Sequence, residues 1–407
     1  MRWIIFIGIY ILIDIYAFQA IKTVTKNNWF HIAYVVASLL VLGLLIYALA
    51  SGQARTSPKM AYIFGIFLAF FVPKLLLIIF MFGEDIVRLF VGLFSKIGGG
   101  NESEFYLPSR RKFVSTLALG IAAIPFVGLL YGMIQGKYNY KVLKYALEFE
   151  DLPEAFDGFT LTQISDVHSG SFDNAKKVAY AVNLVNEQES DIILFTGDLV
   201  NNVANEMTPW KDVFGSLKAT KGVYSVLGNH DYGDYVSWNS KEEQAQNLSE
   251  LKNLQKEMGW DLLLNENRTI EKNGETIKLI GVENWGAGGF KKAGDLEKAC
   301  EGCREEEFKI LMSHDPSHWQ EQVKQHPKNI QLTLSGHTHG MQFGIEIPGW
   351  FKWSPVKYRY ENWAGIYKEF GRYINVNRGF GYLGYPGRVG IWPEVTVITL
   401  KKKRESA

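Results

Sequence analysis

Four long apolar stretches near the start of the chain limit its possible folds more than any other feature. They cover residues 3–20, 32–50, 61–82 and 113–134, and each contains 18 to 22 residues. A helix of about 20 apolar residues crosses a hydrocarbon core of about 30 Å. A cleaved signal peptide would explain only one such stretch, and soluble helices of this length keep a polar face. The pattern therefore predicts four transmembrane helices rather than a buried helical core.

Charged residues divide the chain near residue 136. Residues 1–136 carry 11 basic and 5 acidic side chains, whereas residues 137–407 carry 32 and 37. The denser charge of the second part is typical of a globular domain, and its negative balance argues against a nucleic-acid binder that works by charge. We expect a four-helix transmembrane anchor over 1–136, a linker and domain entry over 137–158, a globular domain over 159–400 and a basic tail over 401–407.

Asp14 and Lys74 interrupt the first and third apolar stretches at similar fractional depths. Alternate spans run in the same direction, so the two side chains should lie at similar depth, where an unpaired charge is costly. We therefore expect an ion pair between them. A proton or ion path is the alternative, and the lack of a further intramembrane acid or histidine disfavours it.

Basic residues gather before the fourth stretch. They are Arg88, Lys96, Arg110, Arg111 and Lys112. Positive loops stay in the cytoplasm, which predicts an inner-membrane, multi-pass protein whose following domain faces the extracytoplasmic side. Residues 109–114, SRRKFV, also resemble a twin-arginine export signal. The alternative is a helix end anchored by its basic residues, and three lysines between residues 137 and 144 weaken the charge bias.

From residue 150 onward, short apolar runs alternate with segments of helical period, which is typical of an α/β domain. A helix is expected over residues 174–188. The expected strands cover residues 159–165, 191–196, 222–227, 276–281, 309–312, 331–334, 373–376 and 395–400.

Chemically active side chains follow five of these strands where each strand ends. The motifs are D-V-H at 166–168, G-D at 197–198, G-N-H-D at 228–231, S-H-D at 313–315 and G-H-T-H-G at 336–340, and they contain five of the 8 histidines. Ligand sites of α/β sheets assemble at the carboxyl ends of strands. Carboxylate, imidazole and amide groups without thiolates suit Mn, Fe, Zn or Mg. Together the motifs predict a site for divalent ions at these strand ends, and a degenerate, non-catalytic metal scaffold is the alternative.

The ordered motifs resemble the calcineurin-like metallophosphoesterase family over roughly residues 159–400. The helical front, the SRRKF string and the closing R-G-F-G, P-G-R and PEVTVITL runs are similar to its membrane-anchored bacterial subgroup. The resemblance implies a four-layer α/β sandwich, with two central β-sheets flanked by helices, behind the transmembrane bundle. It implies one ion held by Asp166, His168, Asp198 and His339. It implies a second ion held by Asp198, Asn229, His314 and His337.

The implied reaction is hydrolysis of a phosphoester or pyrophosphate bond by a hydroxide that bridges the two ions. His230, oriented by Asp231, would assist the leaving group. We expect a lipid-linked or cell-envelope substrate, because the anchor keeps the enzyme beside the bilayer. Two alternatives stay open: a cytoplasmic-face pyrophosphatase acting on a nucleotide-linked glycolipid of the lipid A precursor type, and a membrane sensor or transporter with an accessory hydrolase domain.

Three further features of the sequence each allow more than one interpretation. Arg378 and Arg388 either fork onto a substrate phosphate or form structural salt bridges. Residues 350–363 interleave aromatic and basic side chains, so they either lie at a bilayer surface or over a lipid-bearing substrate, or they pack on their own domain. Cys300 and Cys303 are expected to form a surface disulfide or to be two idle thiols, rather than a redox or zinc site.

Overall fold

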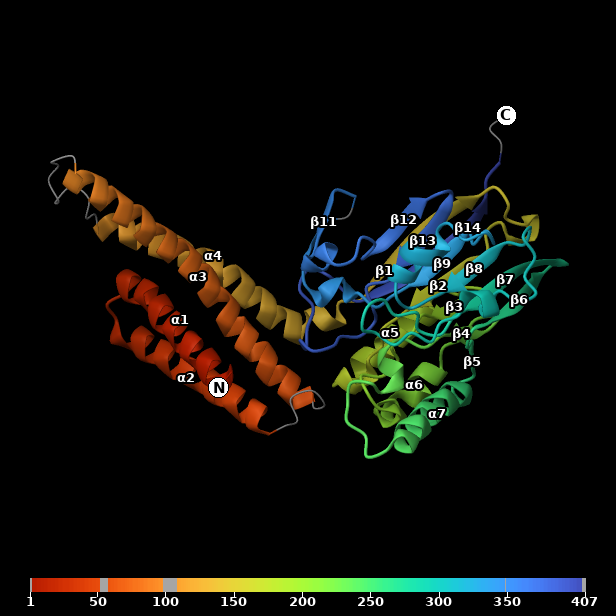
Figure 1. The fold of residues 1–407 in the computed structure, drawn as a ribbon, viewed down its shortest axis with the longest axis horizontal. Coiled ribbons are helices and arrows are strands. Elements are labelled where there is room, and N and C mark those ends of the chain that lie inside the picture. The colour runs from red at the N-terminus through yellow and green to blue at the C-terminus, as the bar shows by residue number, and fades with distance from the viewer. Residues whose placement is uncertain (1, 52–57, 98–107, 348, 405–407) are drawn as a thin grey trace. The chain divides into compact units, whose positions relative to one another are not determined.

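A computed structural model describes residues 2–51, 58–97, 108–347 and 349–404. The chain divides into two compact units, Met1–Ile134 and Gln135–Ala407. In Figure 1 the first unit contains the red to yellow-orange helices, and the second contains the sheets coloured from yellow to blue.

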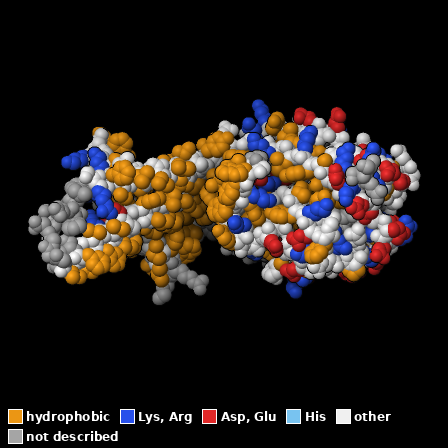
Figure 2. Space-filling model, turned by 90° about the horizontal axis from the view of Figure 1, so that it is seen from above, with side chains coloured by type: hydrophobic (Ala, Val, Ile, Leu, Met, Phe, Trp, Pro, Cys, Tyr) orange, Lys and Arg blue, Asp and Glu red, His pale blue; other side chains and the backbone are white. Residues whose placement is uncertain are grey.

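The first unit is a bundle of long helices. They are α1 (Arg2–Val24), α2 (Asn28–Ala50), α3 (Pro58–Ile97) and α4 (Pro108–Ile134). Each contains a segment long and apolar enough to cross a membrane. Apolar side chains cover most of the bundle surface seen in Figure 2, as expected for helices whose solvent is lipid. Arg88, expected in a connection, lies within α3.

A polar cluster joins the first three helices. Lys74 of α3 forms an ion pair with Asp14 of α1, which confirms the expected pairing. Ser38 and Tyr34 of α2 donate to Asp14 Oδ1 at 2.8 and 2.9 Å, and Lys74 Nζ donates to Ser38 Oγ at 2.9 Å. The two charges therefore have hydrogen-bonding partners inside the bundle, which is the condition for keeping charges among apolar helices.

A second ionic contact joins α3 and α4. Arg111 forms ion pairs with Glu84 and Asp85 near the end of the α3 span. Arg111 is the second arginine of the SRRKFV string, so this residue has a structural partner within the bundle.

The second unit contains two six-stranded sheets. The first has the order β1 (Lys141–Phe149), β14 (Glu394–Lys402), β2 (Thr160–Ile164), β3 (Ile192–Phe195), β4 (Val223–Ser225) and β5 (Trp260–Leu262). The second has the order β12 (Gly365–Glu369), β13 (Arg372–Val376), β9 (Leu332–Ser335), β8 (Lys309–Met312), β7 (Glu275–Gly281) and β6 (Glu266–Lys272). Strands β2 to β5 are parallel to one another, as are β13, β9, β8 and β7. A separate hairpin joins β10 (Ile345–Ile347) to β11 (Phe351–Trp353).

Three apolar cores define four layers. One core fills the space between the sheets, with side chains such as Leu194 of the first and Leu334 of the second. Another packs the first sheet on α5 (Ala175–Asn186), α6 (Lys211–Gly215) and α7 (Lys241–Glu257). The third packs the second sheet on α8 (Leu296–Ala299) and the turn Trp319–Val323. The expected helix–sheet–sheet–helix sandwich is confirmed, and the wholly apolar β3 is buried on both faces.

Residues 137–158 are not only a linker. They contain β1, which pairs with β14 from Lys141 to Phe149. The sequence pattern missed this strand because β1 lies at a sheet edge and exposes several of its polar side chains. At the other end β14 continues to Lys402, so the expected basic tail begins as part of a strand, and residues 405–407 lie outside the described part of the chain.

Candidate metal centre

The predicted motifs converge because both sheets direct strand ends to one region. The loops after β2, β3 and β4 come from the first sheet, and those after β8 and β9 come from the second. Strands β2, β3 and β4 are parallel to one another, and so are β8 and β9, so the carboxyl ends within each set lie at the same edge of their sheet.

The backbone turns sharply at five predicted ligand residues. Asp166, His168, Asp198, His337 and His339 have φ angles of 53°, 47°, 61°, 71° and 51°. This left-handed conformation is uncommon for residues other than glycine, and strained residues of this kind gather at functional sites. It aims the side chains away from the strand direction and into the space between the loops.

Two glycines permit the close approach of the loops. A Cβ at Gly228 would lie 2.2 Å from Asp198 Oδ1, and a Cβ at Gly336 would lie 2.2 Å from Asp166 Oδ2. Any side chain at either position would displace a predicted ligand.

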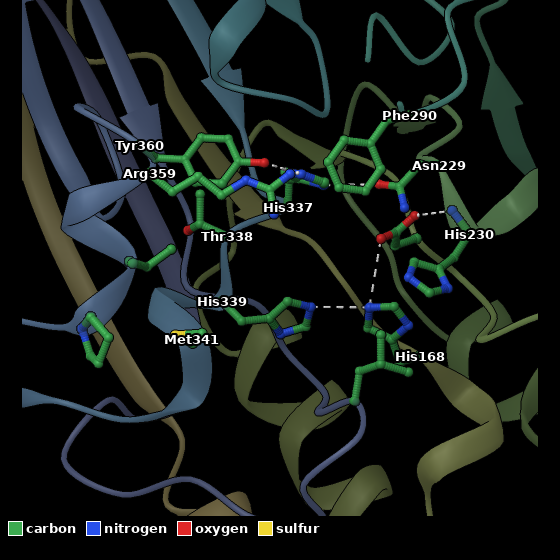
Figure 3. Close-up of a pocket in the computed structure, with 14 residues that line it drawn as sticks. His168, Asn229, His230, Phe290, His337, Thr338, His339, Met341, Arg359 and Tyr360 are labelled. Atoms are coloured by element: carbon green, nitrogen blue, oxygen red, sulfur yellow. Dashed lines mark hydrogen bonds and ion pairs between the residues drawn. The ribbon is translucent and has the colours of Figure 1, made fainter. Parts of the chain in front are cut away.

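The first group of ligand atoms comes from Asp166, His168 and His339. His339 Nε2 lies 3.1 Å from Asp166 Oδ1 and 3.0 Å from His168 Nε2. Figure 3 shows the rings of His168 and His339 facing each other across the pocket. These side chains are buried or nearly so, and their ring nitrogens and carboxylate oxygen point to a common space.

The second group comes from Asp198, His314 and His337. His314 Nε2 lies 3.1 Å from Asp198 Oδ2, and Asn229 Oδ1 lies 2.9 Å from His337 Nδ1. Asp198 Oδ2 also lies 3.6 Å from His168 Nε2. The Asp198 carboxylate therefore stands between the two groups.

The hydrogen bonds around these residues leave ligand atoms available for cations. His314 Nδ1 donates to the Thr196 carbonyl at 2.7 Å, so Nε2 is the nitrogen that faces Asp198. Within the described residues the buried His314 Nε2 makes no regular hydrogen bond and lies beside the Asp198 carboxylate. A buried set of carboxylate, imidazole and amide donors fits divalent cations.

Local electrostatics favours the ligand forms of Asp198, His168 and His337 but not that of His314. Burial alone would lower the pKa of His314, but Asp198 outweighs it and raises that pKa to about 10, so this ring must lose a proton when it binds a cation. Burial alone would raise the pKa of Asp198, but His314 and the neighbouring histidines outweigh it and hold that pKa well below its ordinary value. Burial lowers the pKa of His168, and it lowers the pKa of His337 to about 4. Near neutral pH the carboxylate is therefore ionised and both rings are neutral, as metal ligation requires.

Asp231 does not orient His230, contrary to the sequence expectation. Its carboxylate accepts hydrogen bonds from the backbone N–H groups of Gly228, Asp198 and Leu199 at 2.8, 3.0 and 2.8 Å. Burial, and then the charge of Asp198, raise the pKa of Asp231 to about 7. Asp231 thus ties the loops after β3 and β4 together.

The Asn201 carbonyl orients His230 instead. His230 Nδ1 lies 2.6 Å from Asn201 O, and since a carbonyl only accepts, Nδ1 carries the hydrogen. His230 lines the pocket, and its ring packs against Tyr235 with 4.4 Å between the centroids. No local sequence signal marks Asn201, because its backbone rather than its side chain makes the contact.

The two predicted phosphate-binding arginines are structural. Arg378 is buried and forms ion pairs with Glu346 and Glu394. Arg388 is fully buried and donates to the carbonyls of Gly379 and Gly381 at 3.1 and 2.6 Å. Neither lines the pocket. The salt-bridge alternative therefore describes Arg378, and backbone contacts occupy Arg388.

Aromatic and apolar residues line the pocket beside the two metal-ligand groups. They include Phe290, Met341, Pro355, Val356, Tyr360 and Leu383. Arg359, an exposed residue of the aromatic and basic segment, also lines it and stacks over the Phe290 ring at 5.2 Å. Tyr360 OH lies 2.8 Å from His337 Nε2. Residues 350–363 were expected at a bilayer surface, over a lipid-bearing substrate beside the metals, or packed on their own domain, and four residues of this segment line the pocket: Pro355, Val356, Arg359 and Tyr360.

Cys300 and Cys303 do not form the expected surface disulfide. Both thiols are free, and Cys300 is buried in the core beneath the second sheet. Burial raises the pKa of Cys300 to about 11. This thiol is therefore protonated and unreactive at neutral pH, as the idle-thiol alternative expects.

Comparisons with known proteins agree with this architecture. Residues 1–137 match the family model described as "Probable Calcineurin-like phosphoesterase, transmembrane domain", and residues 159–341 match "Calcineurin-like phosphoesterase". The "Transmembrane protein with metallophosphoesterase domain" of Danio rerio is 30% identical over 298 residues, 71% of this chain and 63% of the fish protein. The "Uncharacterized metallophosphoesterase YkuE" of Bacillus subtilis is 27% identical over 299 residues, 72% of this chain and 98% of that protein.

The fold and the site thus define an α/β sandwich with a cluster of Asp, His and Asn side chains at its strand ends, preceded by membrane-spanning helices. With both family models matched, the chain belongs to the calcineurin-like phosphoesterases that carry a four-helix transmembrane domain. The matched part of the chain spans less than two thirds of the length of the Danio rerio relative.

Proposed function

We propose that the second unit hydrolyses a phosphoester or pyrophosphate bond with two divalent ions. The observation that carries this proposal is the convergence of two ligand groups from five loops on either side of the Asp198 carboxylate. One ion would be held by Asp166, His168, Asp198 and His339. The other would be held by Asp198, Asn229, His314 and His337.

When bound, two divalent ions polarise phosphoryl oxygens and make a water nucleophilic near neutral pH. The chain's own contribution is to hold the ligands in place. Thr196 fixes the His314 ring, and Tyr235 OH accepts from Asn229 Nδ2 at 2.7 Å, which turns Asn229 Oδ1 toward His337. These contacts reduce the reorganisation needed when substrate arrives.

His230 is the proposed general acid. Its Nδ1–H bond to Asn201 prevents the ring from flipping, so Nε2 is the nitrogen left for the substrate. In the protonated ring Nε2–H would donate to the leaving oxygen as the phosphorus–oxygen bond breaks, and the ring would end neutral. Tyr235 packs against the ring and limits its motion.

The proposed substrate is a lipid-linked or cell-envelope phosphate. Two features support it: the same chain carries membrane-spanning helices, and apolar side chains line part of the pocket. Arg359, rather than Arg378 or Arg388, is the proposed contact for a substrate phosphate, because it is exposed and lines the pocket.

The test is metal content and turnover of the full chain in detergent. With manganese added, we expect hydrolysis of bis(p-nitrophenyl) phosphate, loss of turnover on chelation, and preferred turnover of a lipid-linked phosphate in a panel that includes phospholipids, glycolipid precursors and nucleotides. Asp198→Asn should lose both bound manganese, measured by mass spectrometry, and turnover. Asp212→Asn changes an exposed aspartate of α6 and serves as the control. Turnover that survives chelation would contradict the proposal.

A further inference from the structure

Exposed apolar side chains of the second unit gather beside one hairpin. Of the nine large apolar residues that are exposed within described residues 135–404, six lie between residues 341 and 358. These six, here called the apolar hairpin, are Met341, Ile345, Ile347, Trp350, Phe351 and Tyr358. Trp350 is 81% exposed and Tyr358 is 78% exposed. Such a cluster marks an interaction surface, because isolated exposed apolar residues are common but gathered ones are not.

The polarity of the hairpin is the reverse of that in a packed sheet. In the register of β10 and β11, Ile347 pairs with Phe351 and Glu346 pairs with Lys352, so apolar and polar residues lie on opposite faces. The polar face contacts the domain: Glu346 pairs with Arg378, and Lys352 donates to the Ala364 carbonyl. The apolar face is left exposed.

The hairpin is also held firmly at its base. Gly344 N donates to Val389 O at 2.9 Å, and the Arg378 ion pair with Glu346 continues to the buried Glu394. In Figure 1, β11 stands apart from the two six-stranded sheets. A short two-stranded ribbon is only marginally stable by itself. These contacts hold the hairpin in place, so its apolar face stays exposed and does not pack on the core.

The occupant that the chain itself indicates is a bilayer. Only six residues separate the end of α4 at Ile134 from the start of β1 at Lys141. Lys141 lies opposite Glu394 in the sheet, and Glu394 is linked through Arg378 to Glu346 of the hairpin. The hairpin therefore belongs to the same edge of the domain at which the chain arrives from its last span.

The side chains suit an interface between lipid and water. Tryptophan and tyrosine favour that depth because their rings are apolar and their polar atoms reach the headgroups. The exposed charges beside them are Lys357 and Arg359, with Glu361 as the exposed acid. This basic excess suits anionic headgroups.

We propose that the apolar hairpin inserts into the bilayer interface and brings the pocket to the lipid surface. Met341 belongs to the hairpin and also lines the pocket, together with Val356 and Arg359. A lipid in the interface would keep its chains beside the apolar face while its phosphate reaches the metal centre. This last step rests on the proposed function, whereas insertion of the hairpin does not.

The test measures the depth of a spin label in the full chain, reconstituted in vesicles of phosphatidylethanolamine and phosphatidylglycerol. Cys300→Ala and Cys303→Ala remove the native thiols, and Trp350→Cys supplies the labelling site. Phe370→Cys is the matched control. Phe370 is also exposed, but it follows the last residue of β12, whereas Ala364, which the hairpin contacts, precedes the first. We expect the label at position 350 to be reached mainly by oxygen and the label at 370 mainly by a water-soluble nickel chelate.

Equal access of the nickel chelate to both labels would overturn the insertion. Spin–spin broadening between labels at position 350 would also overturn it, because it would place a second copy of the chain on the hairpin.

A second experiment tests the substrate step. The double variant Trp350→Ser with Phe351→Ser should turn over a vesicle-borne phospholipid roughly tenfold more slowly, relative to the turnover of bis(p-nitrophenyl) phosphate by the same variant. An unchanged ratio would overturn that step. If the unmodified chain turned over neither substrate, this would contradict the proposed function but not the insertion of the hairpin.

Discussion

His230 and Asp198 illustrate how residues of two neighbouring loops have separate roles. Asp198 lies between the two groups of predicted ligands, whereas His230 lines the pocket through a ring held by Asn201. Asp231, next in sequence to His230, instead accepts hydrogen bonds from backbone N–H groups of the loops. The proposed roles at adjacent positions of the G-N-H-D motif are therefore a ligand for Asn229 and an acid for His230, whereas Asp231 supports the loops.

The residue-scale prediction concerns His230→Ala. We expect this variant to bind manganese as the unchanged chain does and to lose about 10²- to 10⁴-fold in turnover, the usual contribution of a general acid. The loss should be smaller for a substrate whose leaving group needs no proton, such as a nitrophenolate. Metal analysis measures the bound manganese, and the turnover of nitrophenyl and alkyl phosphate esters measures how the loss depends on the leaving group. Loss of metal equal to that of Asp198→Asn would show that His230 is a ligand.

At the scale of elements, β1 converts an apparent linker into part of the sandwich. Its Leu147 and Phe149 side chains are buried in the core between the sheets, and β1 covers the edge of β14. An uncovered strand edge favours aggregation, and truncating a large core side chain costs about 2–5 kcal/mol.

Two truncations test the importance of β1. A chain starting at Gln135 should melt cooperatively and keep manganese-dependent turnover of bis(p-nitrophenyl) phosphate. A chain starting at Glu150 lacks β1 and should aggregate or melt well below the first. Circular dichroism melting and turnover provide the comparison. If the Gln135 chain is folded but inactive, the membrane helices take part in the chemistry, as the sensor or transporter alternative requires.

At the scale of the whole molecule, membrane topology decides which substrates are available. We propose that the second unit faces the extracytoplasmic side, because basic residues gather before α4 and positive loops stay in the cytoplasm. The ion pairs of Arg111 with Glu84 and Asp85 give this arginine a role inside the bundle, so the SRRKFV string does not need export to explain it.

The prediction is that external protease removes the second unit when the outer face of the inner membrane is accessible, while a cytoplasmic marker protein survives. Exchanging Arg88, Arg110 and Lys112 for glutamine should reduce that cleavage, because it removes positive charge from the end of α3 and the start of α4, which flank the proposed cytoplasmic connection. Protection of the second unit in sealed cells, with cleavage only after lysis, would place it in the cytoplasm and favour the nucleotide-linked glycolipid as substrate.

The sequence alone determined the features whose physics is local. Apolar length predicts the spans, and the opposed charges of Asp14 and Lys74 predict their pairing, since few other partners exist at that depth. The strand-end motifs predict the ligand set because parallel strands align their carboxyl ends. Only the tertiary structure decided what Asp231, Arg378, Arg388 and Asn201 do, because their partners come from distant loops or from backbone atoms. The tertiary structure also decided where edge strands such as β1 and β10 form, since their side-chain patterns depend on what each face contacts.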